Sequence, residues 1–227
     1  MKITCKNISK SYVDNGQLAP RNVLCDLSFE LNSGDSLSIS GPSGTGKSTL
    51  LNMLSGLDKP DTGNIYFDDA CFTKLSNNEK TKFRLKYMSL IFQSNNLLKD
   101  FNVIENIILP LRYKGYSKLD SIKYATKSLE IVKLVDDKYS SITTLSGGEA
   151  QRVGIARALA MNARIILADE PTGNLDKETS ISVMNNLVDI CKENEITLIT
   201  VSHDENILSL SNNHRMISMG KLILSTS

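Results

Sequence analysis

The stretch that most constrains this chain is "GPSGTGKS", residues 41–48. It follows the apolar run "SLSIS" and precedes leucines that recur at helical spacing, so it joins a strand to a helix. The pattern G-x-x-x-x-G-K-[S/T] in that context is typical of a phosphate-binding P-loop. The chain is therefore expected to contain a strand and a helix that meet at an anion site.

Lys47 lies at the start of the predicted helix, where the helix dipole disfavours a cation. A flexible strand-to-helix turn does not explain a lysine at that point, whereas a bound polyphosphate reverses the local charge. The glycines let backbone N–H groups approach phosphate oxygens, Lys47 neutralises their charge, and the Ser48 hydroxyl suits Mg²⁺. We expect the nucleotide contacts of this segment to come from Gly41, Pro42, Ser43, Gly44, Thr45, Gly46, Lys47, Ser48 and Thr49.

Two carboxylates follow a second predicted strand, in "IILADEP". The strand is a short apolar run with β-branched residues, as expected where both faces of a sheet are covered. Because successive side chains on a strand face opposite ways, Asp169 and Glu170 should have different tasks. We expect Asp169 to hold the Mg²⁺ shell and Glu170 to orient and activate a water molecule. A solvated acidic turn before Pro171 is the alternative, and it is the simpler interpretation of these residues taken alone.

A third apolar run, "ITLITVS", is followed by His203. A single histidine is more often structural than catalytic. In a doubly wound parallel sheet, however, all strands end at one edge, and ligands bind there. If the three strands are parallel, Gly41, Asp169 and His203 converge. His203 is then placed to bond a terminal phosphate or to hold Glu170 and a water molecule in position.

The stretch "LSGGEAQR", residues 145–152, indicates a second anion site. Ser146 and Glu149 have the spacing of a capping box at a helix start. Gly147 and Gly148 then fall in the first helical turn, where each costs about 1 kcal/mol relative to alanine. Without side chains at these positions, the backbone donors of the helix start are open to an anion. Since one nucleotide has a single terminal phosphate, a second cradle suggests a second nucleotide or a second chain.

The order of predicted elements indicates an α/β fold with an inserted helical segment. The first forty residues have strand patterns, including an alternating antiparallel pattern in "DLSFEL". Between about residues 95 and 145 two amphipathic helices are predicted, the second with one apolar face formed by Ile122, Ala125, Leu129 and Val132. Strand and helix patterns then alternate again, and "HRMISMGKLILS" predicts a final hairpin.

Charge and hydropathy restrict the partners. The 26 Lys and Arg side chains nearly balance the 25 Asp and Glu side chains, and the formal charge is +1. With no basic stripe in any segment, this balance argues against a nucleic-acid partner and against binding to a membrane surface by charge. The longest apolar stretches, such as "VIENIILPL", are interrupted by Glu105 and Pro110 and fall short of the ~20 residues that a spanning helix needs. A membrane function is therefore expected to need another chain that spans the bilayer.

Taken in this order, the motifs resemble those of the ATP-binding-cassette ATPases, and the resemblance covers nearly the whole chain. "GPSGTGKST" is similar to the Walker A loop, "LSGGE" to the signature motif, "IILADE" to the Walker B motif, "GNLD" to the D-loop and "SHD" to the H-loop. The resemblance implies a P-loop NTPase, RecA-like core with a mixed sheet, an N-terminal antiparallel β subdomain and an inserted α-helical subdomain. Within one nucleotide-binding domain over 1–227, residues 1–92 and 160–227 would form the core with its β subdomain, and about 93–159 the helical subdomain.

The resemblance also implies further site residues. Gln93 in "LIFQS" matches the Q-loop, which contacts Mg²⁺, Tyr12 stands where the family stacks an aromatic ring on adenine, and Asp176 belongs to the D-loop. Two cassettes of the family pack head to tail, so that the signature loop of each caps the ATP bound to its partner. In this chain the residues that would act on the partner's ATP are Ser146, Gly147 and Gly148.

The stretches "LLKDFNVIENIILPL" and "ADEPTGNLD" most resemble the lipoprotein-releasing branch of the family, with macrolide-export and cell-division cassettes as the alternatives. This implies a homodimeric, Mg²⁺-dependent ATP hydrolase that serves a separate integral membrane permease, in the cytoplasm at the inner face of the membrane. A cassette acting on nucleic acid would carry a long coiled-coil insertion or tandem cassettes, and neither occurs in the sequence. A regulatory module that only clamps ATP is disfavoured by the presence of both Glu170 and His203.

Overall fold

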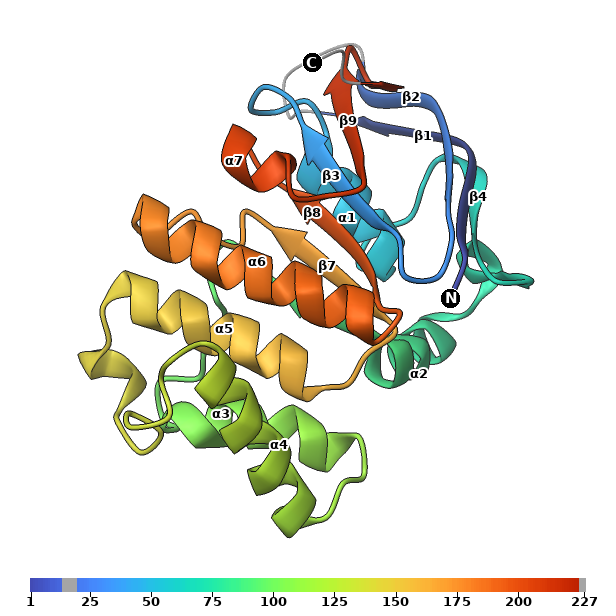
Figure 1. Ribbon diagram of the computed structural model, residues 1–227. Coiled ribbons are helices and arrows are strands. Elements are labelled where there is room, and N and C mark those ends of the chain that lie inside the picture. The colour runs from blue at the N-terminus through green and yellow to red at the C-terminus, as the bar shows by residue number, and fades with distance from the viewer. Residues whose placement is uncertain (14–19, 225–227) are drawn as a thin grey trace.

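The computed structural model describes residues 1–13 and 20–224, which form two β-sheets and a set of helices (Figure 1). The strands are β1 (Ile3–Tyr12), β2 (Arg21–Leu31), β3 (Ser36–Ser40), β4 (Thr62–Phe67), β5 (Ala70–Cys71), β6 (Met88–Ile91), β7 (Ile165–Asp169), β8 (Thr197–Val201), β9 (Asn213–Ser218) and β10 (Lys221–Leu224). The helices are α1 (Lys47–Ser55), α2 (Asn77–Tyr87), α3 (Val103–Tyr113), α4 (Lys118–Ile131), α5 (Gly147–Ala160), α6 (Lys177–Glu193) and α7 (Glu205–Leu208), with short 3-10 turns η1 (Phe72–Lys74) and η2 (Ile142–Thr144).

The central sheet has six strands in the order β10-β9-β3-β8-β7-β6. The pairs from β9 to β6 are parallel, and β10 is an antiparallel edge strand. Buried residues alternate between the two faces: Ile165 and Leu167 of β7 pack with α1, whereas Ile166 and Ala168 pack with α5 and α6. This two-sided burial explains the continuous apolar runs of β7 and β8. The parallel pairing sets the carboxyl ends of β3, β7 and β8 along one edge.

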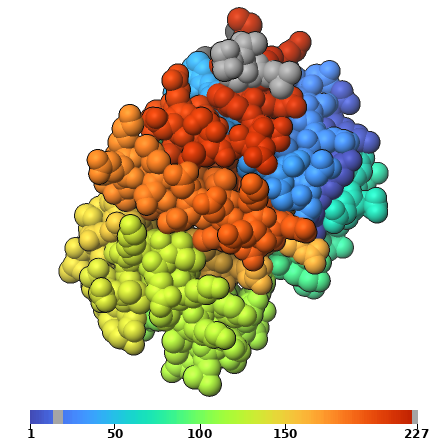
Figure 2. All heavy atoms as spheres, viewed as in Figure 1, coloured from blue at the N-terminus to red at the C-terminus, as the bar shows by residue number. Residues whose placement is uncertain are grey.

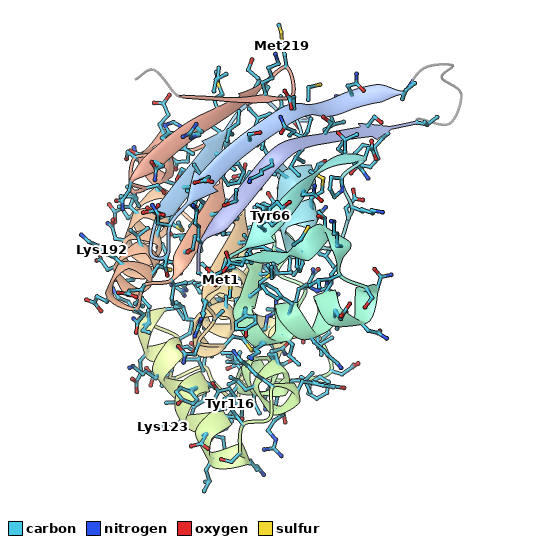
Figure 3. All side chains as sticks on the ribbon, turned by 90° about the vertical axis from the view of Figure 1, so that its right-hand side faces the viewer. Met1, Tyr66, Tyr116, Lys123, Lys192 and Met219 are labelled. Atoms are coloured by element: carbon cyan, nitrogen blue, oxygen red, sulfur yellow. The ribbon has the colours of Figure 1, made fainter. Side chains whose placement is uncertain are left out.

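The second sheet is antiparallel, in the order β2-β1-β4-β5. Its buried face shares a hydrophobic cluster with α1 and with one face of the central sheet. Figure 3 shows the long strands of this sheet lying together in the upper part of the molecule, and it labels Tyr66 of β4. The sheet therefore covers α1, the helix that follows the P-loop. Tyr12, the last residue of β1, lies beside that loop.

The helices α3, α4 and α5 pack on one another and share a second hydrophobic cluster with α6 and the other face of the central sheet. They form the lower part of the molecule in Figure 1, and Figure 2 shows α6 lying across the same face just above them. Ser146 caps α5 with the reciprocal Glu149 bonds of a capping box, as predicted, and Ser76 and Glu79 cap α2 in the same way.

The α/β fold class with a mixed sheet, an antiparallel N-terminal sheet and an inserted run of helices is confirmed. One detail was wrong: Ile122 is 37% exposed, and the buried face of α4 instead contains Ser121, Ala125, Ser128 and Leu129. The predicted final hairpin is β9–β10, although the last residue of its predicted strand, Ser225, lies outside the described residues. Among the described residues, no helix combines the length and the apolar character that crossing a bilayer requires.

Candidate nucleotide site

A cavity of about 650 Å³ lies at the carboxyl ends of β3, β7 and β8. It brings together the predicted P-loop, the two acidic residues at the end of β7, the histidine after β8 and the glutamine after β6. Its lining consists of Tyr12, Arg21, Val23, Gly41, Pro42, Ser43, Gly44, Gly46, Lys47, Ser48, Thr49, Gln93, Asp169, Glu170, Val201 and His203. The convergence expected from parallel strands is therefore present in the folded chain.

The P-loop presents backbone to this cavity because its glycines adopt conformations that other residues avoid. Gly46, the N-cap of α1, has φ 102° and gives the helix no side-chain cap. The first N–H groups of the helix are therefore available to an anion. Gly41 has φ 141°, and a Cβ there would lie 2.6 Å from the Ile217 carbonyl oxygen. The close approach of Ile217 at Gly41 and the positive φ at Gly46 both favour glycine.

Lys47 reaches back over the loop instead of pointing into solvent. Its Nζ donates to the carbonyl oxygens of Gly41 at 2.7 Å and Pro42 at 2.9 Å. Thr45 does not line the cavity; its hydroxyl donates to the Pro42 carbonyl at 2.9 Å and holds the loop. The ammonium group is thus kept above the helix start, where it complements phosphate oxygens.

Three residues with oxygen donors line the cavity: Ser48 with its hydroxyl, Asp169 with its carboxylate and Gln93 with its amide. Burial raises the pKa of Asp169 and the nearby Glu170 carboxylate adds to the rise, whereas an interaction with Ser48 opposes it. A cation would relieve this cost of burying the carboxylate. Hard oxygen donors with a single carboxylate suit Mg²⁺, which is commonly held by one or two carboxylates together with substrate phosphates and water. No cluster of three or more His, Cys, Asp or Glu side chains suited to a metal occurs in the described part of the chain.

Glu170 and His203 form a hydrogen-bonded pair in the cavity. The Nδ1 atom of His203 lies 2.9 Å from Oε1 of Glu170, and this bond, together with the carboxylate charge, raises the pKa of His203. Glu170 is held by its backbone as well, since its N–H donates to the Val201 carbonyl at 2.9 Å and its φ is +47°. Such a backbone conformation is uncommon for a residue with a side chain.

The expectation that Asp169 and Glu170 face opposite ways was wrong. β7 ends at Asp169, so Glu170 lies outside the strand, and its left-handed backbone turns its side chain to the same cavity. The two acidic side chains share one cavity and differ in their partners: Asp169 is near Ser48, and Glu170 is bonded to His203.

Tyr12, the last residue of β1, also lines the cavity and is 40% exposed. The sequence interpretation missed two neighbours of the loop. Arg21 donates to the Gly44 carbonyl at 3.1 Å, and Val23 would lie 2.7 Å from a Cβ on Gly46. Both come from β2, and no local motif marks them, because only the pairing of β1 with β2 brings them to the loop.

The signature stretch does not reach this cavity in the same chain. A Cβ on Gly148 would lie 3.1 Å from the Leu175 side chain, and one on Gly147 would lie 3.9 Å from that of Asn174, so both glycines face the D-loop. Ser146, Gly147, Gly148 and Asp176 are all absent from the cavity lining. Asp176 caps α6, accepting from the Thr179 N–H at 3.0 Å.

Comparisons with known proteins agree with this geometry. Residues 24–173 match the family described as ABC transporter. The lipoprotein-releasing system ATP-binding protein LolD of Francisella tularensis subsp. holarctica (strain OSU18) is 41% identical over 224 residues, which cover 98% of this chain and 96% of that protein. LolD of Treponema denticola is 41% identical over 196 residues, 86% of this chain and 87% of that protein.

Solved structures of an ATP-binding cassette are also similar to this chain. A dimeric, post-hydrolysis structure of the ATP-binding cassette MJ0796, bound to ADP and Pi, superposes with a TM-score of 0.91 at 35% identity. The match covers 97% of this chain and 96% of that one. A second dimeric structure of MJ0796 gives the same TM-score at 36% identity.

Proposed function

The chain belongs to the ABC transporter family of ATP-binding cassettes, and we propose that it is the ATP-hydrolysing subunit of a complex with a separate membrane permease. In this proposal closure of a homodimer on two ATP molecules, followed by hydrolysis and reopening, drives the permease from the inner face of the membrane. The supporting observation is the single cavity that joins the P-loop, the oxygen donors and the Glu170–His203 pair.

Each part of the cavity has a task in this proposal. The P-loop glycines and Lys47 bind the phosphates, and Tyr12 stacks on adenine. Mg²⁺, when bound, would neutralise phosphate charge, with Ser48, Gln93 and Asp169 as its protein contacts. Glu170 accepts a proton from the attacking water, and His203 holds the Glu170 carboxylate in position.

The second copy completes the site. Ser146, Gly147, Gly148 and Asp176 lie outside the cavity of their own chain, which supports their acting on the nucleotide of a partner. Dimeric structures of MJ0796 support the same arrangement by similarity. The glycines at the start of α5 are then explained by two contacts, one with the D-loop of the same chain and one with the partner's ATP.

A Glu170→Gln variant tests the proposal. It should bind MgATP, lose at least ~100-fold in turnover because the general base is removed, and accumulate as a dimer on size exclusion. Glu205→Gln in α7 is the matched control, since it makes the same chemical change outside the cavity lining. Native turnover in Glu170→Gln would reject Glu170 as the base.

Lipoprotein release is the proposed task of the complex, because the relatives at about 40% identity carry that name. Purification of the protein from membranes with its native permease, followed by reconstitution in vesicles, should give ATP-dependent release of a lipoprotein. ATP-dependent export of a macrolide by the same vesicles would select the alternative.

Filter binding in low salt should detect no tight, salt-dependent DNA or RNA complex, because no basic stripe is present.

A further inference from the structure

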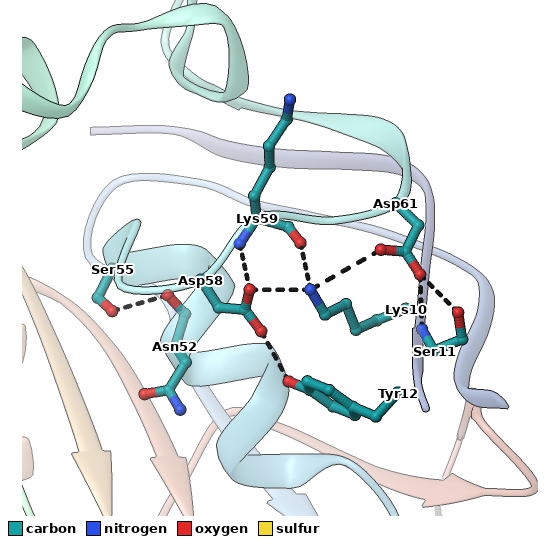
Figure 4. Close-up of polar contacts among 8 residues, drawn as sticks. All are labelled: Lys10, Ser11, Tyr12, Asn52, Ser55, Asp58, Lys59 and Asp61. Atoms are coloured by element: carbon teal, nitrogen blue, oxygen red, sulfur yellow. Dashed lines mark hydrogen bonds and ion pairs between the residues drawn. The ribbon is translucent and has the colours of Figure 1, made fainter. Parts of the chain in front are cut away.

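A group of polar side chains beside Tyr12 joins the end of β1 to the loop that follows α1 (Figure 4). The Tyr12 hydroxyl donates to one carboxylate oxygen of Asp58 at 2.6 Å, and the Lys10 ammonium lies 2.8 Å from the other oxygen. Asp58 therefore bridges the lysine and the tyrosine of the same strand. None of the nucleotide motifs in the sequence includes Asp58 or Lys10.

Lys10 is well shielded from solvent, with its side chain 11% exposed. Its ammonium also donates to the Lys59 carbonyl at 2.8 Å, lies 3.8 Å from an Asp61 oxygen and sits 5.1 Å from the centre of the Tyr12 ring. Burial tends to lower the pKa of Lys10, but the bond to Asp58 and the two carboxylate charges prevail and raise it. A shielded, charge-assisted pair of this kind holds its partners more firmly than an exposed ion pair.

The position of Asp58 is fixed by the end of α1. Gly56 has φ 69° and reverses the chain, so that the N–H groups of Leu57 and Asp58 both donate to the Asn52 carbonyl, at 2.9 and 3.1 Å. A Cβ on Gly56 would lie 2.8 Å from the Phe72 ring, so this reversal is specific to glycine. Asp58 is thereby attached to the same helix whose first turn forms the phosphate end of the cavity.

A second carboxylate ties the neighbouring residue of β1 to the same loop. Asp61 accepts from the Ser11 N–H at 2.7 Å and from the Ser11 hydroxyl at 2.8 Å, and its own N–H donates to the Ser9 carbonyl at 2.9 Å. The last residues of β1 therefore cannot shift relative to α1 without breaking several bonds.

From this geometry we propose that Asp58, held by Lys10, is the positioning residue for the nucleotide base. It fixes the Tyr12 ring at a set place relative to the phosphate loop, and because the Tyr12 hydroxyl donates to Asp58, that hydrogen is not available to the base. The inference rests on the proposed function, in which Tyr12 stacks on adenine. A ring that is ordered beforehand loses less side-chain entropy on binding, which corresponds to about two- to tenfold in affinity.

A double-mutant cycle tests the proposal. Tyr12→Phe removes only the hydroxyl, Asp58→Ala removes the bridge, and MgATP affinity is measured by calorimetry for both variants and for the double variant. Inorganic tripolyphosphate, which lacks a base, is titrated in parallel. Asp68→Ala is the matched control, because that carboxylate joins the β4–β5 turn to the start of β1 by accepting from the Lys2 N–H and does not line the cavity.

We expect each single variant to bind MgATP about two- to tenfold more weakly, the double variant to be no weaker than the weaker single variant, and tripolyphosphate affinity to stay unchanged. Native affinity in Tyr12→Phe, additive losses in the double variant, or an equal loss of tripolyphosphate affinity in Asp58→Ala would each overturn the positioning role. Tyr12→Ala separates the positioning role of Asp58 from the stacking role of Tyr12. If it binds MgATP like the native protein, the stacking assignment itself fails; if it binds weakly while Tyr12→Phe does not, only the positioning role fails.

Discussion

The contact between His203 and Glu170 gives a quantitative prediction for the hydrolysis step. The two side chains meet at 2.9 Å, with the Glu170 side chain 15% exposed and the His203 side chain 77% exposed. A hydrogen bond to a charged group contributes about 1.5–3 kcal/mol, and solvent on the histidine side favours the lower part of that range. If His203 holds the Glu170 carboxylate against the attacking water, His203→Ala removes about 1.5–2 kcal/mol of transition-state stabilisation, a loss of about 10- to 30-fold in kcat.

The assay is phosphate release at saturating MgATP, with nucleotide affinity measured separately by calorimetry. Affinity should change by less than about twofold, because the bond acts on the base rather than on the P-loop. His203→Asn is the informative control, since its amide can place a donor close to the position of Nδ1 and should recover part of the rate. A native kcat in His203→Ala, or a loss confined to affinity, would refute the positioning of Glu170 by His203.

Three further predictions concern a histidine, a glycine and a buried leucine. An NMR titration should place the pKa of His203 above its ordinary value of about 6.5 and show that this pKa falls in Glu170→Gln. The pair also stabilises the folded state slightly; this stabilisation is present below pH ~6.5 and is lost as pH rises through the folded-state pKa of His203. Gly41→Ala should weaken MgATP binding at least ~10-fold because its Cβ would lie 2.6 Å from the Ile217 carbonyl, whereas Gly115→Ala, where a Cβ meets no atom within 4 Å, should bind normally. Leu187→Ala should lower the free energy of unfolding by about 2–5 kcal/mol in urea denaturation, since this α6 side chain is fully buried.

The parts of the fold and site that the sequence predicted correctly depend on local chemistry. The P-loop has its glycines and lysine within eight consecutive residues, and the box that Ser146 forms with Glu149 spans four. The strands before Asp169 and His203 were visible as apolar runs because both faces of the sheet are covered. Parallel pairing then brought their ends together, as a general property of such sheets.

The features that escaped prediction depend on contacts between distant segments. The backbone of Glu170 is set by a bond to Val201, more than thirty residues away, so strand alternation gave the wrong side-chain direction. Arg21 reaches the P-loop only because β2 pairs with β1. Asp58 reaches Tyr12 only because Gly56 reverses the chain after α1.

The most direct test of the account is a mixing experiment with two inactive variants, because its central claim is a site shared between two copies. Lys47→Ala damages the P-loop and Gly148→Asp the signature loop, so a mixed dimer contains one damaged composite site and one intact site. Each variant alone should be almost inactive, and the equimolar mixture, after exchange of subunits, should regain a clear fraction of native ATP hydrolysis. If the mixture stays as inactive as its components while mixed dimers are shown to form, the signature loop does not act on the partner's nucleotide.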